Sequence, residues 1–341
     1  MTEYCLFFCY SPSKHFHAHL YEHLLSISAE KNGFSSHKTT AHSGILKIPL
    51  TNNQKKPVDL NKIINLSLID SKDLQKEAQR VYMEVAAGLD MPEKLFLNLT
   101  QYQANSRQEF EAKLNNEYKN LPQLEALKKS AMFITNVSVK ETGVIPASKI
   151  KECFSLRKEG ALILPHEIKL PKAGKLTFLQ IATRVPINNW LEMYKLIALE
   201  SLLMNQLKQE IIREGLAYSV KPLVYQDYTK HLFLSLQLRT MPKLAAEAIE
   251  KTKNLISKPR INENGDKETL SRIVDGFIRK IEKKSSTFQE KINRVWQQLT
   301  WGNFIPIKTQ VKALQALRVD ELRDWWTEKI LQSTFHILKS A

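Results

Sequence analysis

The sequence predicts an α+β fold with two domains, each combining antiparallel strands with packed helices. Short apolar runs typical of strands occur in both halves of the 341-residue chain, and longer stretches of helical periodicity lie between them. Strands and helices do not alternate one for one, as they do around a parallel sheet. The length suits about two domains, and we place them at residues 1–168 and 175–341, around a segment that contains Pro171 and Gly174.

The first domain begins with a strand that leads directly into a helix. Residues 4–10 are an apolar run, and Ser11-Pro12 follows with a possible N-cap and a proline suited to the first helical position. A helix is predicted over residues 13–29, and Asn32-Gly33 then forms a turn. The later elements expected in this domain are a strand at 44–50, a helix at 72–88, helical pattern over 92–131, a segment at 146–155 and a strand-like segment at 161–165.

The second domain follows the same mixed pattern. An apolar strand at 175–185 precedes a long helix at 188–214, which Gly215 ends. Two further strands are expected at 217–226 and 231–239. The remainder has helical periodicity, and the predicted helices are 241–257, 266–299 and 319–339.

Charge and hydropathy limit the kinds of partner that the protein is expected to bind. The formal net charge is +15, with Lys and Arg spread along the whole chain, which indicates either a generally basic solvated surface or a basic wall that attracts an acidic polypeptide. We expect no nucleic-acid partner, because basic residues are not interleaved with aromatic ones in a recognisable motif. No stretch approaches the roughly 20 apolar residues of a membrane span, so no membrane partner is expected.

The cysteines favour a cytoplasmic protein with reduced thiols. Cys5, Cys9 and Cys153 are odd in number, and the first residues do not resemble a secretory leader. Cys5 and Cys9 share one face of the first strand, where packing in the core is the simplest interpretation, with metal or redox use as the alternative.

A metal-binding pattern lies on the first predicted helix. At 100° per residue, His19, Glu22 and His23 fall on one face, so two imidazoles one turn apart could bind one zinc ion. The carboxylate between them could take a proton from a water molecule. This H-x-x-E-H order reverses the better-known H-E-x-x-H pattern. Alone, such a pentapeptide is more often a solvated helix face.

The third ligand is expected from the helix at 72–88. Glu77 and Glu84 are two helical turns apart and share a face. We predict Glu84 as the ligand, with Glu77 orienting a ligand or the water. Four other histidines of this region are expected at the surface or around the site: His15, His17, His37 and His42.

Several segments together resemble the pitrilysin/insulysin-like, or M16, peptidases, also called inverzincins. The segment HAHLYEHLLSISAEKNGFSSHKTTAHSGILKIPL resembles the start of that family, and QKEAQRVYMEVAAGLDMP matches its E-x6-E helix. REGLAYSV resembles the family's G-L-A-Y motif. The tail WQQLTWGNFIP…LQALRVDELRDWWTEKIL looks like its last helices, so the resemblance extends over nearly the whole chain.

The resemblance implies a Zn²⁺-dependent endopeptidase that cleaves peptides inside a clamshell chamber. His19, His23 and Glu84 match the family's metal ligands, and Glu22 matches its general base. Tyr218 matches a tyrosine that polarises the scissile carbonyl from the second domain. The edge strand that receives the peptide corresponds to the segment containing Ser36, His37 and Thr39.

Some positions depart from the family pattern. Ile211 stands where the family often has an arginine, seven residues before the tyrosine, and Ser36-His37 replaces the usual Asn-Ala. Two such domains make half a clamshell, so the resemblance implies a homodimer or a heterodimer with a related subunit. The alternative function is a catalytically weak subunit that supports a partner peptidase.

Overall fold

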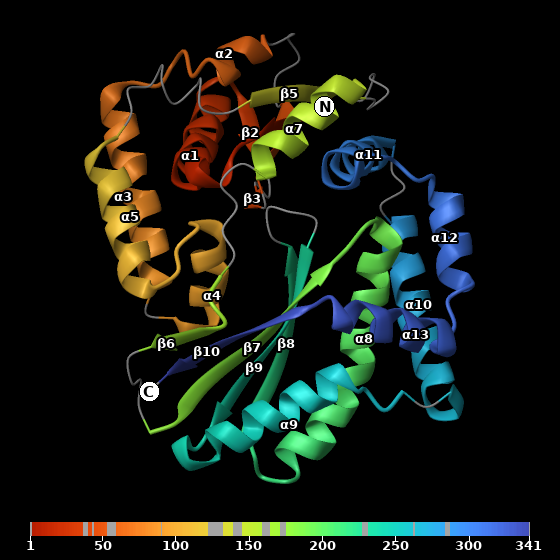
Figure 1. Cartoon of the computed structure of the whole chain (residues 1–341). Helices are drawn as coiled ribbons and strands as arrows, with labels where there is room; N and C mark the ends of the chain where they lie inside the picture. The colour runs from red at the N-terminus through yellow and green to blue at the C-terminus, as the bar shows by residue number, and fades with distance from the viewer. Residues whose placement is uncertain are drawn as a thin grey trace. The chain divides into compact units, whose positions relative to one another are not determined.

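The computed structural model divides the chain into two compact units (Figure 1). Unit 1 comprises Met1–Ile163 and Ser286–Phe304, and unit 2 comprises Leu164–Ser285 and Ile305–Ala341. The residues that the structure describes are 2–36, 40–42, 44–52, 59–89, 91–121, 132–138, 145–158, 164–170, 175–226, 231–261, 263–283 and 287–340.

Unit 1 is built around an antiparallel five-stranded sheet. The strands follow the order β2-β4-β1-β5, and β3 also pairs with β4. Their bounds are β1 Thr2–Cys9, β2 Phe34–Ser36, β3 Thr40–His42, β4 Ile45–Asn52 and β5 Met132–Ser138.

Both faces of strand β1 are covered, which explains its continuous apolar run. Phe8 points to one face and meets the ring of Tyr21 edge-on at 5.3 Å between centroids. Cys5, Phe7 and Cys9 point to the other face and join a separate buried cluster. A strand enclosed on both sides has no reason to alternate apolar with polar residues.

The helix predicted at 13–29 is present as α1, His15–Lys31, after a 3-10 turn η1 at Pro12–Lys14. Ser11 occupies the predicted cap position, but its hydroxyl bonds the Ser13 hydroxyl at 2.9 Å and caps no backbone N–H. The other described helices of this part of the chain are α2 Leu60–Ile64, α3 Ser71–Ala87, α4 Pro92–Gln101, α5 Arg107–Lys119 and α7 Ala147–Lys158.

Helix α3 begins at a strong local signal. The Asp70 side chain accepts from the backbone N–H groups of Lys72 and Asp73, and the Asp73 side chain accepts from the backbone N–H of Asp70. Such a reciprocal cap fixes where the first turn of α3 begins. The start of the helix in turn determines which side chains lie on the face toward α1, among them Glu77 and Glu84.

Unit 1 also contains a helix from late in the sequence, α11 at Thr287–Trp301. Its residues Ile292, Val295 and Leu299 pack into the cluster that holds Phe7 of β1. The predicted second domain, 175–341, includes this helix, and the predicted single helix at 266–299 is in fact α10 Glu263–Lys283 followed by α11. Helical periodicity revealed the apolar face of α11 but not the sheet that it covers.

The cysteine prediction is wrong for two of the three residues. Cys9 of β1 and Cys153 of α7 form a disulfide within unit 1. Cys5 is free and fully buried in the same cluster, as core packing requires. Burial raises the pKa of the Cys5 thiol to about 12, so it stays neutral.

Unit 2 contains a second five-stranded sheet, with the order β6-β10-β7-β9-β8. Strand β10 runs parallel to β6, and the other neighbours are antiparallel. The bounds are β6 Glu167–Leu170, β7 Thr177–Pro186, β8 Ser219–Gln226, β9 His231–Thr240 and β10 Thr334–Ser340.

The last predicted helix, 319–339, is too long. Helix α13 covers Val319–Leu331, and the chain then enters β10 between β6 and β7. Residues of β10 alternate between buried and half-buried, which is the strand period. The prediction of a helix therefore failed over residues 334–339, which belong to a strand with a neighbour on each side.

Helices of unit 2 pack on this sheet and on one another. The long predicted helix at 188–214 is regular as α8, Trp190–Leu207, and continues as one π turn over Lys208–Ile212. The remaining described helices of the unit are η3 Pro242–Leu244, α9 Ala245–Ser257, α10, α12 Ile307–Gln315 and α13.

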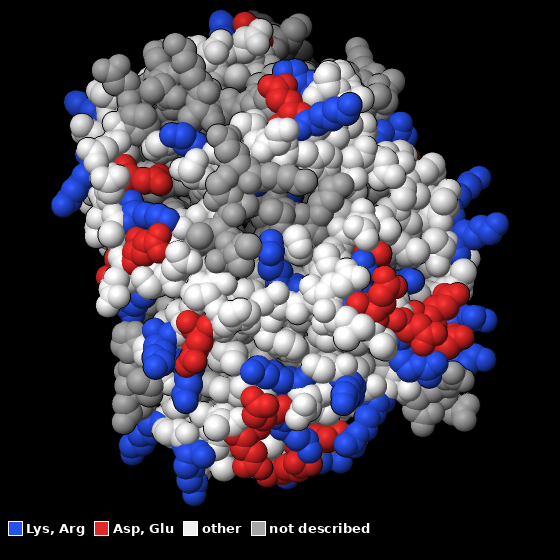
Figure 2. Space-filling view, in the orientation of Figure 1, with Lys and Arg blue, Asp and Glu red and all other residues white. Residues whose placement is uncertain are grey.

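Charged side chains of both signs share the surface. On the face drawn in Figure 2, Lys and Arg lie among Asp and Glu and do not form one continuous basic area. Within the part of the chain that the structure describes, no helix combines the length and apolar character needed to cross a membrane.

Candidate metal centre

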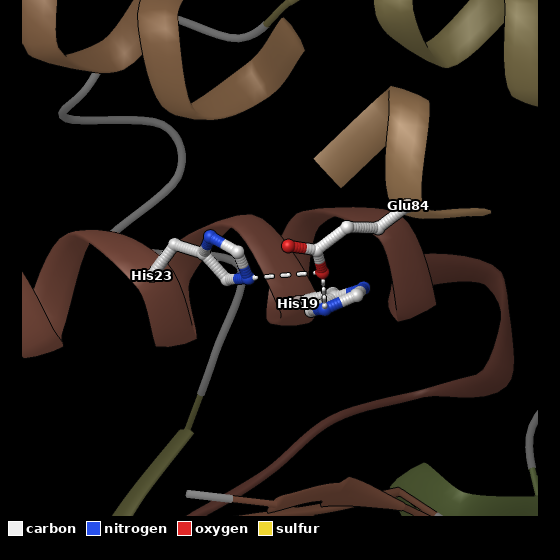
Figure 3. Close-up of side chains that lie close together, drawn as sticks. All are labelled: His19, His23 and Glu84. Carbon is white, nitrogen blue, oxygen red and sulfur yellow. Dashed lines mark ion pairs between the residues drawn. The ribbon is translucent and has the colours of Figure 1, made fainter. Parts of the chain in front are cut away.

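Helices α1 and α3 of unit 1 pack against each other and bring the predicted ligands together. His19 and His23 lie one turn apart on α1, with ring centroids 5.1 Å apart and ring planes at 75°. Figure 3 shows Glu84 of α3 facing both imidazoles, with one carboxylate oxygen between them. That oxygen, Oε2, is 3.8 Å from His19 Nε2 and 3.6 Å from His23 Nε2.

The three side chains fit a zinc ion. Each offers a ligand atom within 4.8 Å of the others. In a tetrahedral site with bonds near 2.0–2.2 Å, neighbouring ligand atoms are about 3.4 Å apart, so the two distances from Glu84 need to shorten by only a few tenths of an ångström. Two imidazoles and one carboxylate also leave a fourth position for water or substrate, as in catalytic rather than structural zinc sites.

Glu77 fixes the protonation of one imidazole. Its buried Oε2 lies 3.0 Å from His23 Nδ1. Since an ionised carboxylate can only accept, Nδ1 carries the proton and donates it to this bond. His23 Nε2 then has its lone pair directed at the position that Glu84 also faces, and imidazole ligands of metals are typically oriented by such a partner.

His19 is held in the neutral form that a ligand needs. Burial, together with the neighbouring His23, lowers the pKa of His19 to about 4. At neutral pH its lone pair is therefore free for a metal without the loss of a proton.

Arg80 is a contact that the sequence interpretation missed. Its guanidinium lies 3.5 Å from Glu77 Oε2 and 3.9 Å from Glu84 Oε1. Arg80 stands three residues after one glutamate and four before the other, a helical spacing that could have indicated this bridge.

No protein-family model matches the chain, and no curated protein sequence matches it. Solved structures do match over the whole chain. A protease from Helicobacter pylori has a TM-score of 0.64 at 14% identity, with 100% of this chain and 94% of that chain covered. A protein described as an M16-like peptidase from Alicyclobacillus acidocaldarius has a TM-score of 0.57 at 11% identity, with 99% and 92% covered.

The chain has an M16-like fold. At these identities the likeness concerns the fold and not the activity. A chain from a structure of complex III of Candida albicans with Inz-5 bound is equally similar, with a TM-score of 0.62, 14% identity, and 99% and 90% of the two chains covered.

In this M16-like fold, the other residues predicted for catalysis and substrate binding in unit 1 lie on different elements. Glu22 is buried on α1 between the two histidines. Ser36 ends strand β2 and pairs with Leu50 of β4. His37 and Thr39 lie outside the described residues.

The G-L-A-Y segment lies in unit 2 and directly precedes β8. Gly215 has φ +74°, a left-handed conformation that glycine adopts without strain, and it follows the π turn. Tyr218 is 59% exposed, and its backbone N–H donates to the Arg239 carbonyl at 2.8 Å. Ile211, at the position where M16 peptidases often have arginine, is fully buried and packs in the core of unit 2.

Proposed function

We propose that the chain is a zinc-dependent endopeptidase. The observation that carries the proposal is the group of His19, His23 and Glu84, which places three zinc-type ligand atoms within 4.8 Å of one another. The M16-like fold supports the assignment, because proteases are among its most similar structures.

The roles of the side chains follow from their positions. When bound, zinc lowers the pKa of water and polarises a carbonyl oxygen. Glu22 accepts a proton from the attacking water and returns it to the leaving amine. Its place on the turn between the two histidines suits this role, and its burial limits competition from solvent. Glu77 keeps His23 in the correct tautomer.

The substrate is a peptide that adds to the edge of the unit 1 sheet as an extra strand. Ser36, His37 and Thr39 belong to the segment proposed to receive it. Tyr218, whose side chain is exposed on unit 2, is proposed to polarise the scissile carbonyl in its own chain or in a neighbouring one. The partner is a second copy or a related subunit, because two such domains form half of the family's chamber.

The disulfide is relevant to the cellular compartment in which the protein is proposed to reside. Disulfides persist mainly in oxidising environments, so the Cys9–Cys153 bridge favours an oxidising compartment over the cytoplasmic location that the cysteine count suggested.

The test combines zinc quantification with cleavage of a mixed peptide library, with and without a chelator. Wild type should bind one zinc per chain and lose activity to the chelator. Glu22→Gln should keep its zinc and lose cleavage by at least about 100-fold. Glu30→Gln is the matched control, the same change at an exposed position of the same helix, and should behave as wild type.

Two results would redirect the proposal. A chain that takes up no zinc would refute the metal assignment. A chain that holds zinc but cleaves only when a related subunit is added would favour the alternative function, a catalytically weak subunit that supports a partner peptidase.

A further inference from the structure

A concave site lies in unit 1, at the N-terminal end of α1 beside α5. Its volume is about 350 Å³, enough for a side chain or a small organic molecule. The lining residues are Pro12, Ser13, His15, Tyr102, Gln103, Lys113, Asn116 and Glu117. We call it the α1–α5 pocket. The proposed metal ligands are not among these residues.

Two buried oxygen atoms of this pocket have no hydrogen-bond partner. One is the hydroxyl of Tyr102, a residue with only 7% of its surface exposed. The other is Glu117 Oε2, whose nearest printed neighbour is His17 Nε2 at 3.8 Å, too far for a hydrogen bond. Buried polar atoms in folded proteins are nearly always paired, so two such atoms in one pocket point to a missing donor.

Tyr102 and Glu117 both line the α1–α5 pocket. Burial first, and then the negative charge of Glu117, raises the pKa of the Tyr102 phenol. The Tyr102 ring is held by edge-on contact with His15 at 4.8 Å and by contact with Phe110 at 4.9 Å. These two ring contacts hold the Tyr102 side chain in place.

The cation that lines the pocket is already engaged. Lys113 Nζ lies 2.7 Å from Glu109 Oε1 and also donates to the Gln103 carbonyl. Lys14 is near enough to lower the pKa of Glu117, but neither lysine gives Oε2 a hydrogen bond. Burial outweighs both lysines and raises the pKa of Glu117 to about 7, as expected for a carboxylate without a donor.

These features define what the pocket lacks. Water could donate to both oxygens, but it would not compensate the buried charge. A ligand with several N–H donors and a positive charge supplies both.

We propose that the α1–α5 pocket binds a primary ammonium group, with the Glu117 carboxylate and the Tyr102 hydroxyl as acceptors. The ammonium group belongs either to a free small amine or to a lysine side chain of a polypeptide. The proposal does not depend on zinc or on peptide cleavage, so it can fail or hold separately from the proposed function.

The test is calorimetric titration of the full-length protein at pH 8 with n-butylamine hydrochloride, which mimics a lysine side chain. Butyrate and n-butanol are the anionic and neutral probes of the same size. Butylamine should bind, and the other two should bind at least tenfold more weakly. Glu117→Gln and Tyr102→Phe should each weaken butylamine binding by tenfold or more, because the first removes the negative charge and the second removes one acceptor.

Glu111→Gln is the matched control on the same helix, at a position whose carboxylate pairs with Arg107 at the surface. It should leave butylamine binding unchanged. A lysine-containing peptide and the same peptide with its lysine acetylated distinguish the two sources of the ammonium group. If the unmodified peptide binds and the acetylated peptide does not, the ligand is a lysine side chain of a polypeptide. If butylamine binds and neither peptide binds, the ligand is a free amine.

Three results overturn the proposal: no binding of butylamine, tighter binding of butyrate, or unchanged butylamine affinity in Glu117→Gln. The unfolding midpoint of Glu117→Gln at pH 8 checks the fold. If the carboxylate is a ligand group without a partner, this variant is as stable as wild type or more stable, whereas a structural role for the charge predicts a loss.

Discussion

Removal of the Cys9–Cys153 bridge is expected to destabilise unit 1 by about 2–5 kcal/mol. The bridge joins positions 144 residues apart, and the loop-closure relation for that length gives about 5 kcal/mol as an upper value. The lower value reflects the usual shortfall between this relation and measured disulfides. Cys9→Ala with Cys153→Ala is the appropriate double variant, because serine would place two hydroxyl groups in an apolar cluster.

Hydrogen exchange followed by mass spectrometry is the assay, because it reports on unit 1 separately from unit 2. Amides of β1 and α11 should exchange about 30-fold faster or more in the double variant, the equivalent of 2 kcal/mol. Cys5→Ala is the matched control, since Cys5 lies in the same cluster without a bridge. It removes one buried sulfur and should cost about 1 kcal/mol.

Two observations would refute this reasoning. One is an unchanged exchange rate for β1 and α11 in the double variant. The other is alkylation of three thiols, rather than one, when wild-type protein is denatured without reductant.

Three further predictions concern single side chains. Glu84→Ala should lose bound zinc while Glu77→Ala loses less, because only Glu84 contributes a ligand atom; normal zinc content in both variants would contradict the assignment. Relative to wild type, Glu117→Gln should gain stability as pH rises from about 4.5 to 7, by up to about 3 kcal/mol, because a carboxyl whose pKa is raised by folding opposes folding once it ionises. Urea unfolding at a series of pH values measures the difference in stability between variant and wild type. A difference that does not change with pH would contradict the prediction. Trp326→Phe should destabilise unit 2 by about 1–3 kcal/mol, because the buried Trp326 Nε1 donates to the Ile256 carbonyl at 2.7 Å and that acceptor would lose its partner; thermal unfolding checks this.

The pH prediction depends on the groups that face Glu117. Lys14 and Lys113 lower the pKa of this carboxyl, whereas burial raises it more. Burial also lowers the pKa of the neighbouring His17 to about 4. In wild type the contribution of His17 to folding stability therefore increases as pH rises from about 4 to 6.5, whereas the contribution of Glu117 decreases. For this reason the comparison is between variant and wild type rather than between two pH values.

Local signals predicted the helices around the candidate metal centre well. Helix α3 has a reciprocal cap and one apolar face, and α1 follows the turn that begins at Pro12, so both lie close to their predicted ranges. The pairing of His19 and His23 with Glu84 followed from helix geometry together with the family resemblance. Periodicity alone contains no information about which two helices meet.

Tertiary partners explain what the sequence did not reveal. Strand β10 was predicted as helix because the pattern preceding it is helical, and only the neighbours β6 and β7 determine its conformation. The bond between Cys9 and Cys153 depends on contact between β1 and α7, which no spacing rule identifies. The α1–α5 pocket likewise arises from segments that are far apart in the sequence, such as Ser13 and Glu117.

The position of α11 in unit 1 has a consequence for biosynthesis. On the ribosome, at roughly 5–20 residues per second, α11 is made about 7–30 s after Cys153. Until then the nascent chain exposes the face of β1 that Ile292, Val295 and Leu299 later cover. A truncated protein that stops after Ile163 would keep this face permanently open and is expected to aggregate, so the shortest expressible version of unit 1 needs residues up to Phe304.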